Sequence, residues 1–568
     1  MAVKGSGNKM IQSGNYLGNI SRTKVRNDYD YRTTFSSGYL FPIFAQEIYP
    51  AFGQGINCAE LVRSITPLGP TMDNAFLDIY FFFVPSRLLW DHFEEFIAGY
   101  NKEAWAQDVE YSKPRIIFKE LDAPAEPDYN EYSHSFLDYL PGACDVQTLL
   151  YGQYAAYEAD TPAQEGDPRS TDAIDRLNNL MWIDALYPRA YVKIWNDWFR
   201  DENLQDELEL YTGDNDEYAD EFAFDLLDGS KLPKACKLHD RITSALPAPV
   251  KGPDVLIPMK GLEIGMANNL ALPGSKNVQI RGTVSPVDGI IPAQVDLGAG
   301  DIRNVVANNV SNTIRMLRLA TQTELLLARD ARGGTRFTES IMSHFKVHNG
   351  DARLQRSEYL GSRSIPLNVQ QVTNMSQAGD NALGNVGGQS VTKDSHFYFN
   401  QSFGEWGIVL GLATVRTAIS RSSGIRKIYQ RKGRFDHIWP EFKHIGDVPL
   451  LTREVEVSQQ FFQDPGHSVD KVFGYTPYGS EFRTGVNLNT GLFRAKADGS
   501  LSYLTYQESF PSDDMPVLSS DYIQTDPSIV SQTLVDQNGP QYYALFHITE
   551  DLVIPLDPTS DPGLMDHF

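Results

Sequence analysis

The strongest hydrophobic signal in the chain is an uninterrupted run near residue 80. Six consecutive large apolar or aromatic side chains, Ile79–Val84, contain no polar position, and Pro85 ends the run. A membrane-spanning helix needs about 20 apolar residues, so this run is too short to be one. An apolar run without alternation is typical of a strand whose two faces are both buried. We therefore expect a central strand of a β-sandwich here.

Further strand patterns surround this run at both ends of the chain. In the N-terminal part they are Tyr39–Phe44, Cys58–Ile65 and Phe76–Val84. The links Pro50–Gly55 and Thr66–Pro70 are too short for the crossovers that parallel strands require, which predicts antiparallel pairing. Short β-like runs resume at Gly407–Val415 and Gln541–Ile548. We predict one sandwich with long insertions, whose final strands return to pair with the first ones.

Residues 174–200 have a helical pattern. Arg176–Leu186 is expected to form one helical piece, which Pro188 interrupts. The following piece has one aromatic face at helical spacing, made of Tyr191, Ile194, Trp195 and Trp198. Core packing is the simpler explanation of this stripe, and a cofactor box is the alternative.

A second helix is expected over Val305–Ala331. Gly333–Gly334 provides its stop, because glycine favours helix ends. Its predicted buried side consists of Val310, Ile314, Leu317 and Leu325.

The composition is that of a globular protein. The 568 residues are 41% hydrophobic and 21% charged. Three cysteines, Cys58, Cys144 and Cys236, lie far apart without metal-ligand spacing, so we expect free thiols in a reducing cytoplasm. Met1–Ile20 lacks the apolar region of a signal peptide, and no segment reaches the length of a membrane span. We therefore expect no membrane insertion.

The net charge of −24 is unevenly distributed. Residues 201–228 contain twelve Asp and Glu and no Lys or Arg. Such a block is usually a solvated loop, and a site for a divalent cation is the alternative, since carboxylate oxygens suit calcium and magnesium. A negative net charge is unusual for a protein whose main task is to bind phosphate groups.

One stretch, Arg416–Arg434, is strongly basic and contains no acid. Its cations are Arg416, Arg421, Arg426, Lys427, Arg431, Lys432 and Arg434, with Tyr429 among them. Arg315–Arg363 adds nine Lys and Arg against five Asp and Glu. Basic groups attract phosphate and aromatic rings can stack on unpaired bases, so we predict that the seven cations face nucleic acid. Ordinary solvated or intersubunit ion pairs are the alternative.

Catalytic motifs are missing from the sequence. It has no Gly-x-Ser-x-Gly elbow, Walker A loop or His-Glu-x-x-His helix. Arg332–Thr335 is glycine-rich but lacks the lysine of a P-loop, and a helix stop explains it better. His344 and His348 are spaced to share a helix face as metal ligands, but no third ligand is visible, so the spacing is more simply incidental. We predict no catalytic residue, no metal site and no cofactor.

Met72–Phe96, which includes the apolar run, closely resembles the MDN…FFFVP…LLWD signature of microvirus major coat proteins, particularly the gokushovirus branch. Similar matches follow in order at Asn27–Pro50, Tyr187–Gln205, His239–Gly252, Leu325–Gly361, Gly404–Pro440, Phe473–Arg494 and Met565–Phe568. The chain departs from the family at Ser357, where proline is expected, in the acid-rich loop 201–228, and at Ser500–Phe510, which lacks a Trp-His pair.

The resemblance implies a structural coat protein. Its fold would be mainly β, an eight-stranded antiparallel jelly-roll with long loop insertions containing helices. Subunits would assemble through pentamers into a T=1 icosahedral shell around circular single-stranded DNA, made in the host cytoplasm and located in the virion. Implied partners are minor, pilot or scaffolding proteins and a host receptor. A small basic protein is expected to neutralise most of the genome, because the coat is acidic.

The expected organisation is a flexible basic arm, 1–26, followed by one coat domain, 27–568. Within that domain we expect a helical and loop insertion at 91–252, a three-fold surface protrusion at 253–300, a helical and basic insertion at 301–395, and a returning β-rich part at 396–568. The protrusion is placed at 253–300 because that segment differs in composition from its flanks, and an exposed loop is a plausible site of host attachment.

A jelly-roll carbohydrate-binding protein or glycosidase is the alternative, because it would also be acidic, β-rich and aromatic. The basic stretches and the missing signal peptide argue against it. An exposed cleft with aromatic platforms and paired carboxylates would argue for it.

Overall fold

The computed structural model describes residues 22–98, 111–117, 135–143, 182–251, 314–333, 355–373, 386–457, 471–508, 510 and 516–556. The chain forms two compact units. One consists of Met1–Pro249 with Gly334–Phe568, and the other is Val250–Gly333.

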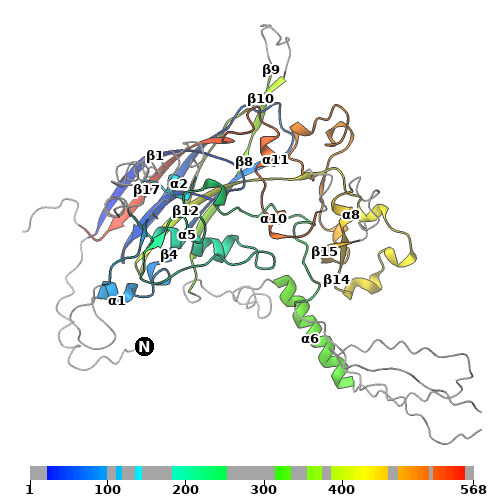
Figure 1. Ribbon diagram of the computed structural model, residues 1–568, viewed down its shortest axis with the longest axis horizontal. Coiled ribbons are helices and arrows are strands. Elements are labelled where there is room, and N and C mark those ends of the chain that lie inside the picture. The colour runs from blue at the N-terminus through cyan, green and yellow to red at the C-terminus, as the bar shows by residue number, and fades with distance from the viewer. Residues whose placement is uncertain are drawn as a thin grey trace, which may run out of the picture. The chain divides into compact units, whose positions relative to one another are not determined.

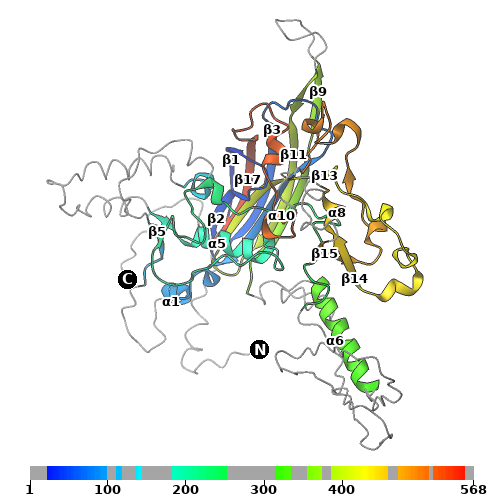
Figure 2. The ribbon, with the colours of Figure 1, turned by 45° about the vertical axis from the view of Figure 1, so that its right-hand side comes forward.

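Two four-stranded sheets form the body of the first unit (Figures 1 and 2). The first sheet has the order β1-β17-β3-β11, with strands Thr23–Phe35, Tyr542–Ile554, Gly53–Ser64 and Thr392–Ser402. The second has the order β2-β12-β4-β8, with strands Phe41–Ile48, Gly407–Thr417, Ala75–Pro85 and Glu358–Leu367. All pairs within these sheets are antiparallel, so the predicted antiparallel, mainly β architecture is confirmed.

The last strand pairs with the first, as the sequence predicts. The β1–β17 ladder runs from the pair Phe35 and Tyr542 to the pair Thr23 and Ile554. Three further pairs have the same nested form along the chain: β2 with β12, β3 with β11, and β4 with β8. The strands therefore pair from the outermost inward along the sequence.

Strand β4 is buried on both faces, which confirms the expectation for Ile79–Val84. On one face, the ring of Phe81 lies 4.8 Å from that of Tyr398 in β11, so the two sheets pack against each other. On the other face, the ring of Phe82 lies 5.6 Å from that of Trp198. The strand has no polar face because another sheet covers one side and a helical layer covers the other.

That helical layer is α5 (Leu186–Ile194), continued by the π-helical turn η2 (Trp195–Phe199). Tyr191 and Ile194 are fully buried, and Tyr191 Oη donates to the carbonyl of Leu40 at 2.7 Å, so the aromatic stripe is core. The prediction that Pro188 interrupts a helix is wrong. Pro188 lies in the first turn of α5, where its missing N–H is not needed.

The part of Arg176–Leu186 that the structure describes is also not the predicted helix, because Ile183–Asp184 form strand β6. This strand belongs to a small sheet of order β6-β5-β7, with β5 at Arg115–Ile117 and β7 at Glu217–Tyr218. The other short elements of this region are η1 (Ser86–Leu88), α1 (Phe93–Ala98), α2 (Phe136–Tyr139) and η3 (Gly229–Lys231).

The C-terminal half adds short elements outside the two large sheets. The strands are β9 (Val369–Thr373), β10 (Val386–Ser390), β13 (Ser420–Arg421), β14 (Asp447–Leu451), β15 (Val472–Pro477) and β16 (Asn487–Leu488). The helices are α8 (Thr452–Val455), α10 (Ser520–Ile523) and α11 (Ser528–Ser531). Several of these elements pack around a second hydrophobic core, made of Ile242, Ala245, Leu450, Val455, Phe473, Tyr522 and Ile523.

Helix α6 (Ile314–Gly333) lies in the second unit and ends at the predicted stop. Leu325, assigned to the buried side, is 55% exposed, so that assignment is wrong. Val310 and the side chains of Ile314 and Leu317 lie outside the described residues. None of the helices that the structure describes is long and apolar enough to span a membrane.

Two expected boundaries shift in the structure. Strand β1 begins at Thr23, inside the arm placed at 1–26, and residues 1–21 lie outside the described part. Strand β8 and the start of β11 come from the insertion placed at 301–395, so the return to the large sheets begins at Glu358. The protrusion placed at 253–300 also lies outside the described residues.

Candidate nucleic-acid interface and aromatic pocket

The predicted basic stretch forms a turn-rich surface, which we call the basic corner and define as residues 422–444 with 480–493. It is built of single 3-10 turns, namely η5 (Lys427–Tyr429), η6 (Arg434–Asp436), η7 (Pro440–His444), η8 (Ser480–Phe482) and η9 (Gly491–Phe493). Gly424 anchors its start, because a side chain there would collide with the carbonyl oxygen of Glu454. Arg453 O accepts a backbone hydrogen bond from Ile425 at 2.9 Å.

Three of the seven predicted cations form ion pairs with carboxylates of the same subunit. Arg421 is buried and binds Glu508 at 2.8 Å and Asp240 at 3.2 Å. Arg416 and Arg431 also pair with carboxylates, those of Asp78 at 2.6 Å and Glu481 at 3.0 Å. Their charges are neutralised within the subunit. We therefore correct the prediction and remove these three arginines from the nucleic-acid-facing set.

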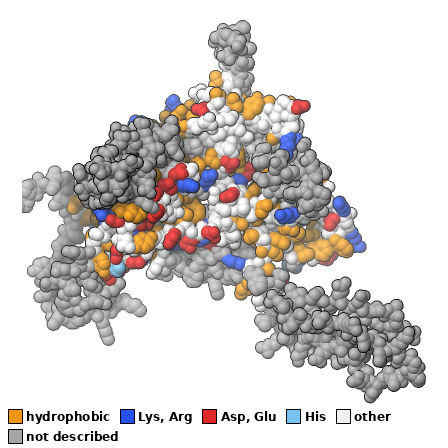
Figure 3. Space-filling view, in the orientation of Figure 1, with side chains coloured by type: hydrophobic (Ala, Val, Ile, Leu, Met, Phe, Trp, Pro, Cys, Tyr) orange, Lys and Arg blue, Asp and Glu red, His pale blue; other side chains and the backbone are white. Residues whose placement is uncertain are grey.

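The other four, Arg426, Lys427, Lys432 and Arg434, make no ion pair with any residue that the structure describes. Lys427 is half-buried and the other three are exposed. Large apolar side chains lie among them in the sequence and are unusually exposed, Tyr429 at 75% and Phe435 at 73%. Figure 3 shows hydrophobic and basic side chains together at the right-hand edge, where the yellow segment of Figure 1 lies.

A network of buried charged residues lies next to the basic corner. Glu508 accepts hydrogen bonds from both Lys237 and Arg421, and Lys237 also donates to the carbonyl of Tyr522. A second buried pair joins Arg241 to Glu454 at 2.8 Å. Sequence reasoning missed these pairings because the partners are 271 and 213 positions apart, and no local pattern connects them.

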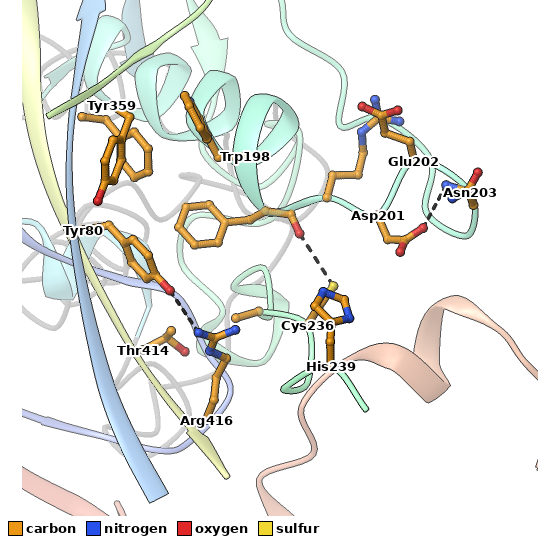
Figure 4. Close-up of a pocket in the computed structure, with 14 residues that line it drawn as sticks. Tyr80, Trp198, Asp201, Glu202, Asn203, Cys236, His239, Tyr359, Thr414 and Arg416 are labelled. Atoms are coloured by element: carbon orange, nitrogen blue, oxygen red, sulfur yellow. Dashed lines mark hydrogen bonds between the residues drawn. The ribbon is translucent and has the colours of Figure 1, made fainter. Parts of the chain in front are cut away.

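The second candidate site is a pocket of about 440 Å³ on the outer face of the second large sheet (Figure 4). Its floor is formed by side chains of three adjacent strands, namely Tyr80 and Phe82 of β4, Thr414 and Arg416 of β12, and Tyr359 of β8. We call this site the aromatic pocket. The sequence analysis did not identify it.

The walls of the aromatic pocket come from two loop segments. One runs from Trp198 to Asn203 at the end of η2, and the other contributes Ala235, Cys236 and His239. Burial raises the pKa of Cys236 to about 11, so its thiol is neutral and contributes to the pocket only by lining it. The sequence analysis had noted Trp198 in the aromatic stripe, Tyr80 and Phe82 in the apolar run and Arg416 in the basic stretch, but no pattern connected them.

The acid-rich segment 201–228 is partly used to hold the fold together. Asp216 pairs with Arg115 at 2.7 Å, and Glu217 pairs with the fully buried Arg189 at 2.7 Å. Within the part of the chain that the structure describes, no group of three or more His, Cys, Asp or Glu is placed to hold a metal ion. His344 and His348 lie outside that part. Cys58 and Cys236 are free thiols, and Cys144 is not among the described residues.

The described part of the chain is a mainly β protein with an exposed basic corner. Comparison with known families shows which class of protein it is. A family model described as capsid protein (F protein) matches residues 14–148 and 174–564, which is most of the chain. The chain belongs to this capsid protein family.

Curated relatives agree over nearly the whole length. Capsid protein VP1 of Chlamydia phage 1 is 28% identical over 623 aligned residues, covering 96% of each chain. The proteins of the same name from Bdellovibrio phage phiMH2K and Spiroplasma virus 4 are each 30% identical, covering 92% and 96% of this chain and 91% and 96% of their own. The resemblance to microvirus major capsid proteins is confirmed, and with it a structural role in a virus coat.

Proposed function

We propose that this chain is the subunit of a T=1 icosahedral shell that encloses a circular single-stranded DNA genome. The strand pairing supports the proposal independently of family membership. The eight strands of the two large sheets, counted along the chain, pair as 1 with 8, 2 with 7, 3 with 6 and 4 with 5. Rolling such a nested ladder into two sheets produces the jelly-roll, a fold used by many viral capsids.

The proposed partners follow from this function and from the charge of the chain. Subunits contact one another in pentamers and then in the shell. Because the coat carries a net charge of −24, a small basic protein is proposed to neutralise most of the packaged DNA. Minor, pilot or scaffolding proteins and a host receptor complete the set. We place the product in the virion and its assembly in the host cytoplasm.

The exposed members of the basic corner are the proposed DNA contacts. They are Arg426, Lys427, Lys432 and Arg434. The support is that these four cations make no ion pair with a described carboxylate and that the exposed rings of Tyr429 and Phe435 accompany them. Cations bind phosphates, while aromatic rings stack on unpaired bases.

The insertion at 253–300 is proposed as the surface protrusion at the three-fold axes, contributing to host attachment. The support is that Val250–Gly333 forms a compact unit separate from the two large sheets. A separate unit can vary or be lost without disturbing the sheets that build a shell.

Electron microscopy of the purified protein tests the main proposal. Samples come from coat protein expressed alone and from a lysate of infected host cells. Uniform small icosahedral shells from either source support the proposal. Shells from the lysate together with pentamers from the expressed protein also support it and add a requirement for assembly partners. Monomers from both sources would contradict it.

A further inference from the structure

Strands β9 and β10 extend beyond the two large sheets (Figures 1 and 2). β9 directly follows β8, an edge strand of one large sheet, and β10 leads into β11, an edge strand of the other. The two extensions pair antiparallel with each other and with no other strand that the structure describes. We call this pair, Val369–Thr373 with Val386–Ser390, the edge hairpin. A hairpin of two strands is only marginally stable alone in water, so a further packing partner would stabilise it.

One face of the edge hairpin lies against the body of the subunit at its base. A side chain at Gly388 would come within 2.7 Å of the carbonyl oxygen of Gly69, and Ser390 on the same face is buried. The opposite face carries Val372, which is 46% exposed, and the exposed Gln370. Residues paired across a ladder share a face, so we define the open face as Gln370, Val372, Gly387 and Gln389.

Gly387, on the open face, is not required by the fold of the subunit. Glycine inside a strand weakens it and often marks a place where another backbone approaches closely. Gly388 is explained by its contact with Gly69, but a Cβ added at Gly387 would meet only the carbonyl oxygen of Val372, at an ordinary distance of 3.8 Å. The φ angle of Gly387 is not in the left-handed region either. The glycine therefore indicates a close neighbour from outside the subunit.

The edge hairpin carries no charge. Its ten residues contain no Asp, Glu, Lys or Arg, although the whole chain is 21% charged. Exposed strands usually carry charged side chains that prevent association, as Arg363 of β8 and Lys393 of β11 do farther along the same strands. Where a surface meets its own copies around an axis, each charge is repeated and repels itself. An uncharged face with an exposed valine therefore suits another copy of this chain better than DNA.

We propose that the open face meets the open faces of neighbouring copies at a rotation axis of the assembled coat. The side chain of Val372 packs against its counterparts there, and Gly387 leaves room for the copies to approach. The inference rests on the proposed function, because it requires subunits that assemble with closed symmetry. It adds one of the surfaces through which they do so.

Gly387→Thr separates folding from assembly. In the isolated subunit the added side chain has room and threonine favours strands, so the melting temperature should stay the same or rise slightly. In the assembly it should collide with a neighbouring copy and lower the association constant roughly tenfold or more. Mass photometry over a concentration series and electron microscopy compare it with unaltered protein from the same source. Ser395→Thr, at an exposed position of β11, is the matched control and should assemble normally.

Cross-linking tests the contact directly. After assembly, a short bis-maleimide should link Val372→Cys into multimers, because its thiols face one another around the axis. Ser395→Cys should give only the background of the unaltered protein, in which Cys58 is buried. Assembled Val372→Cys that does not cross-link, or normal association of Gly387→Thr, would overturn the inference and leave the proposed function intact. Unaltered protein that stays monomeric from every source would overturn both.

Discussion

Glu60 and Tyr398 form a hydrogen bond in the interior between the two large sheets, where the hydroxyl of Tyr398 donates to Glu60 Oε1 at 2.7 Å. Glu60 is only 3% exposed, and its second oxygen, Oε2, has no partner among the described residues. Burial raises the pKa of Glu60 to about 7 from an ordinary value of 4.5. The sandwich therefore contains a carboxyl group that the fold prefers to keep protonated.

This raised pKa predicts that the coat subunit loses stability as pH rises. Below pH 4.5 the carboxyl is protonated in both folded and unfolded chains, and its favourable contribution is fully present. Between 4.5 and about 7 the unfolded chain releases the proton more readily, so the free energy of unfolding falls over this window by roughly 3 kcal/mol at most. Denaturant unfolding at pH 5, 6, 7 and 8 measures the fall. Glu60→Gln, which cannot titrate, should flatten it, and an equal slope in that variant would refute the assignment to Glu60.

Loss of Glu508 should destabilise the base of the basic corner. Glu508→Gln leaves the buried cations Lys237 and Arg421 without their shared carboxylate, and breaking a buried ion pair in this way costs about 3–5 kcal/mol. The matched control is Asp551→Asn, which removes an exposed pair with Lys24 and should change stability by less than about 1 kcal/mol. Urea unfolding compares the two variants. Equal effects would mean that the network is not structural.

The DNA assignment predicts a reduced salt dependence. Replacing Arg426, Lys432 and Arg434 together by alanine should weaken binding of oligo(dT). It should also lower the slope of log affinity against log salt concentration by up to about 0.7 per cation removed. Lys24→Ala, an exposed cation outside the corner, is the control. Filter binding over a salt series gives both quantities. An unchanged slope in the triple variant would show that the corner faces something other than DNA.

Deleting residues 255–298 should separate folding from attachment. The variant is expected to fold and to form shells, because the segment belongs to a unit apart from the two large sheets. Its shells should lack surface projections in electron micrographs, and they should fail to adsorb to host cells. Normal adsorption by the deletion variant would show that another surface attaches to the host.

Local patterns predicted the sheets well. The unbroken run Ile79–Val84 identified a strand with two buried faces, because burial of this kind is visible in adjacent residues. The short links before and after Cys58–Ile65 did not join paired strands, since β3 lies in one large sheet while β2 and β4 lie in the other. The predicted helix break at Pro188 was wrong because proline stops a helix only in its interior. The helix begins just before Pro188, at Leu186.

The candidate sites depended on contacts that no local pattern encodes. Arg421 and Arg434 look alike in a basic stretch, yet one is buried against Glu508 and the other is exposed. The difference arises from a carboxylate 87 positions away. The aromatic pocket is similar, since Tyr80, Tyr359 and Thr414 become neighbours only when three strands align in one sheet. Long-range pairing of this kind sets which polar residues are free to bind a ligand.

The pairing of β1 with β17 also sets when a newly made subunit can be completed. Phe35 cannot pair until Tyr542 has been synthesised, so about 500 residues are translated between the two strands of this ladder. At about 5–20 residues per second the ribosome needs roughly half a minute to two minutes for that stretch. Throughout this time β1 and one side of β3 have no strand beside them, because β17 lies between them in the finished sheet. The nascent chain is therefore exposed to wrong edge pairing until synthesis is almost over, and only finished chains can acquire the complete sheet.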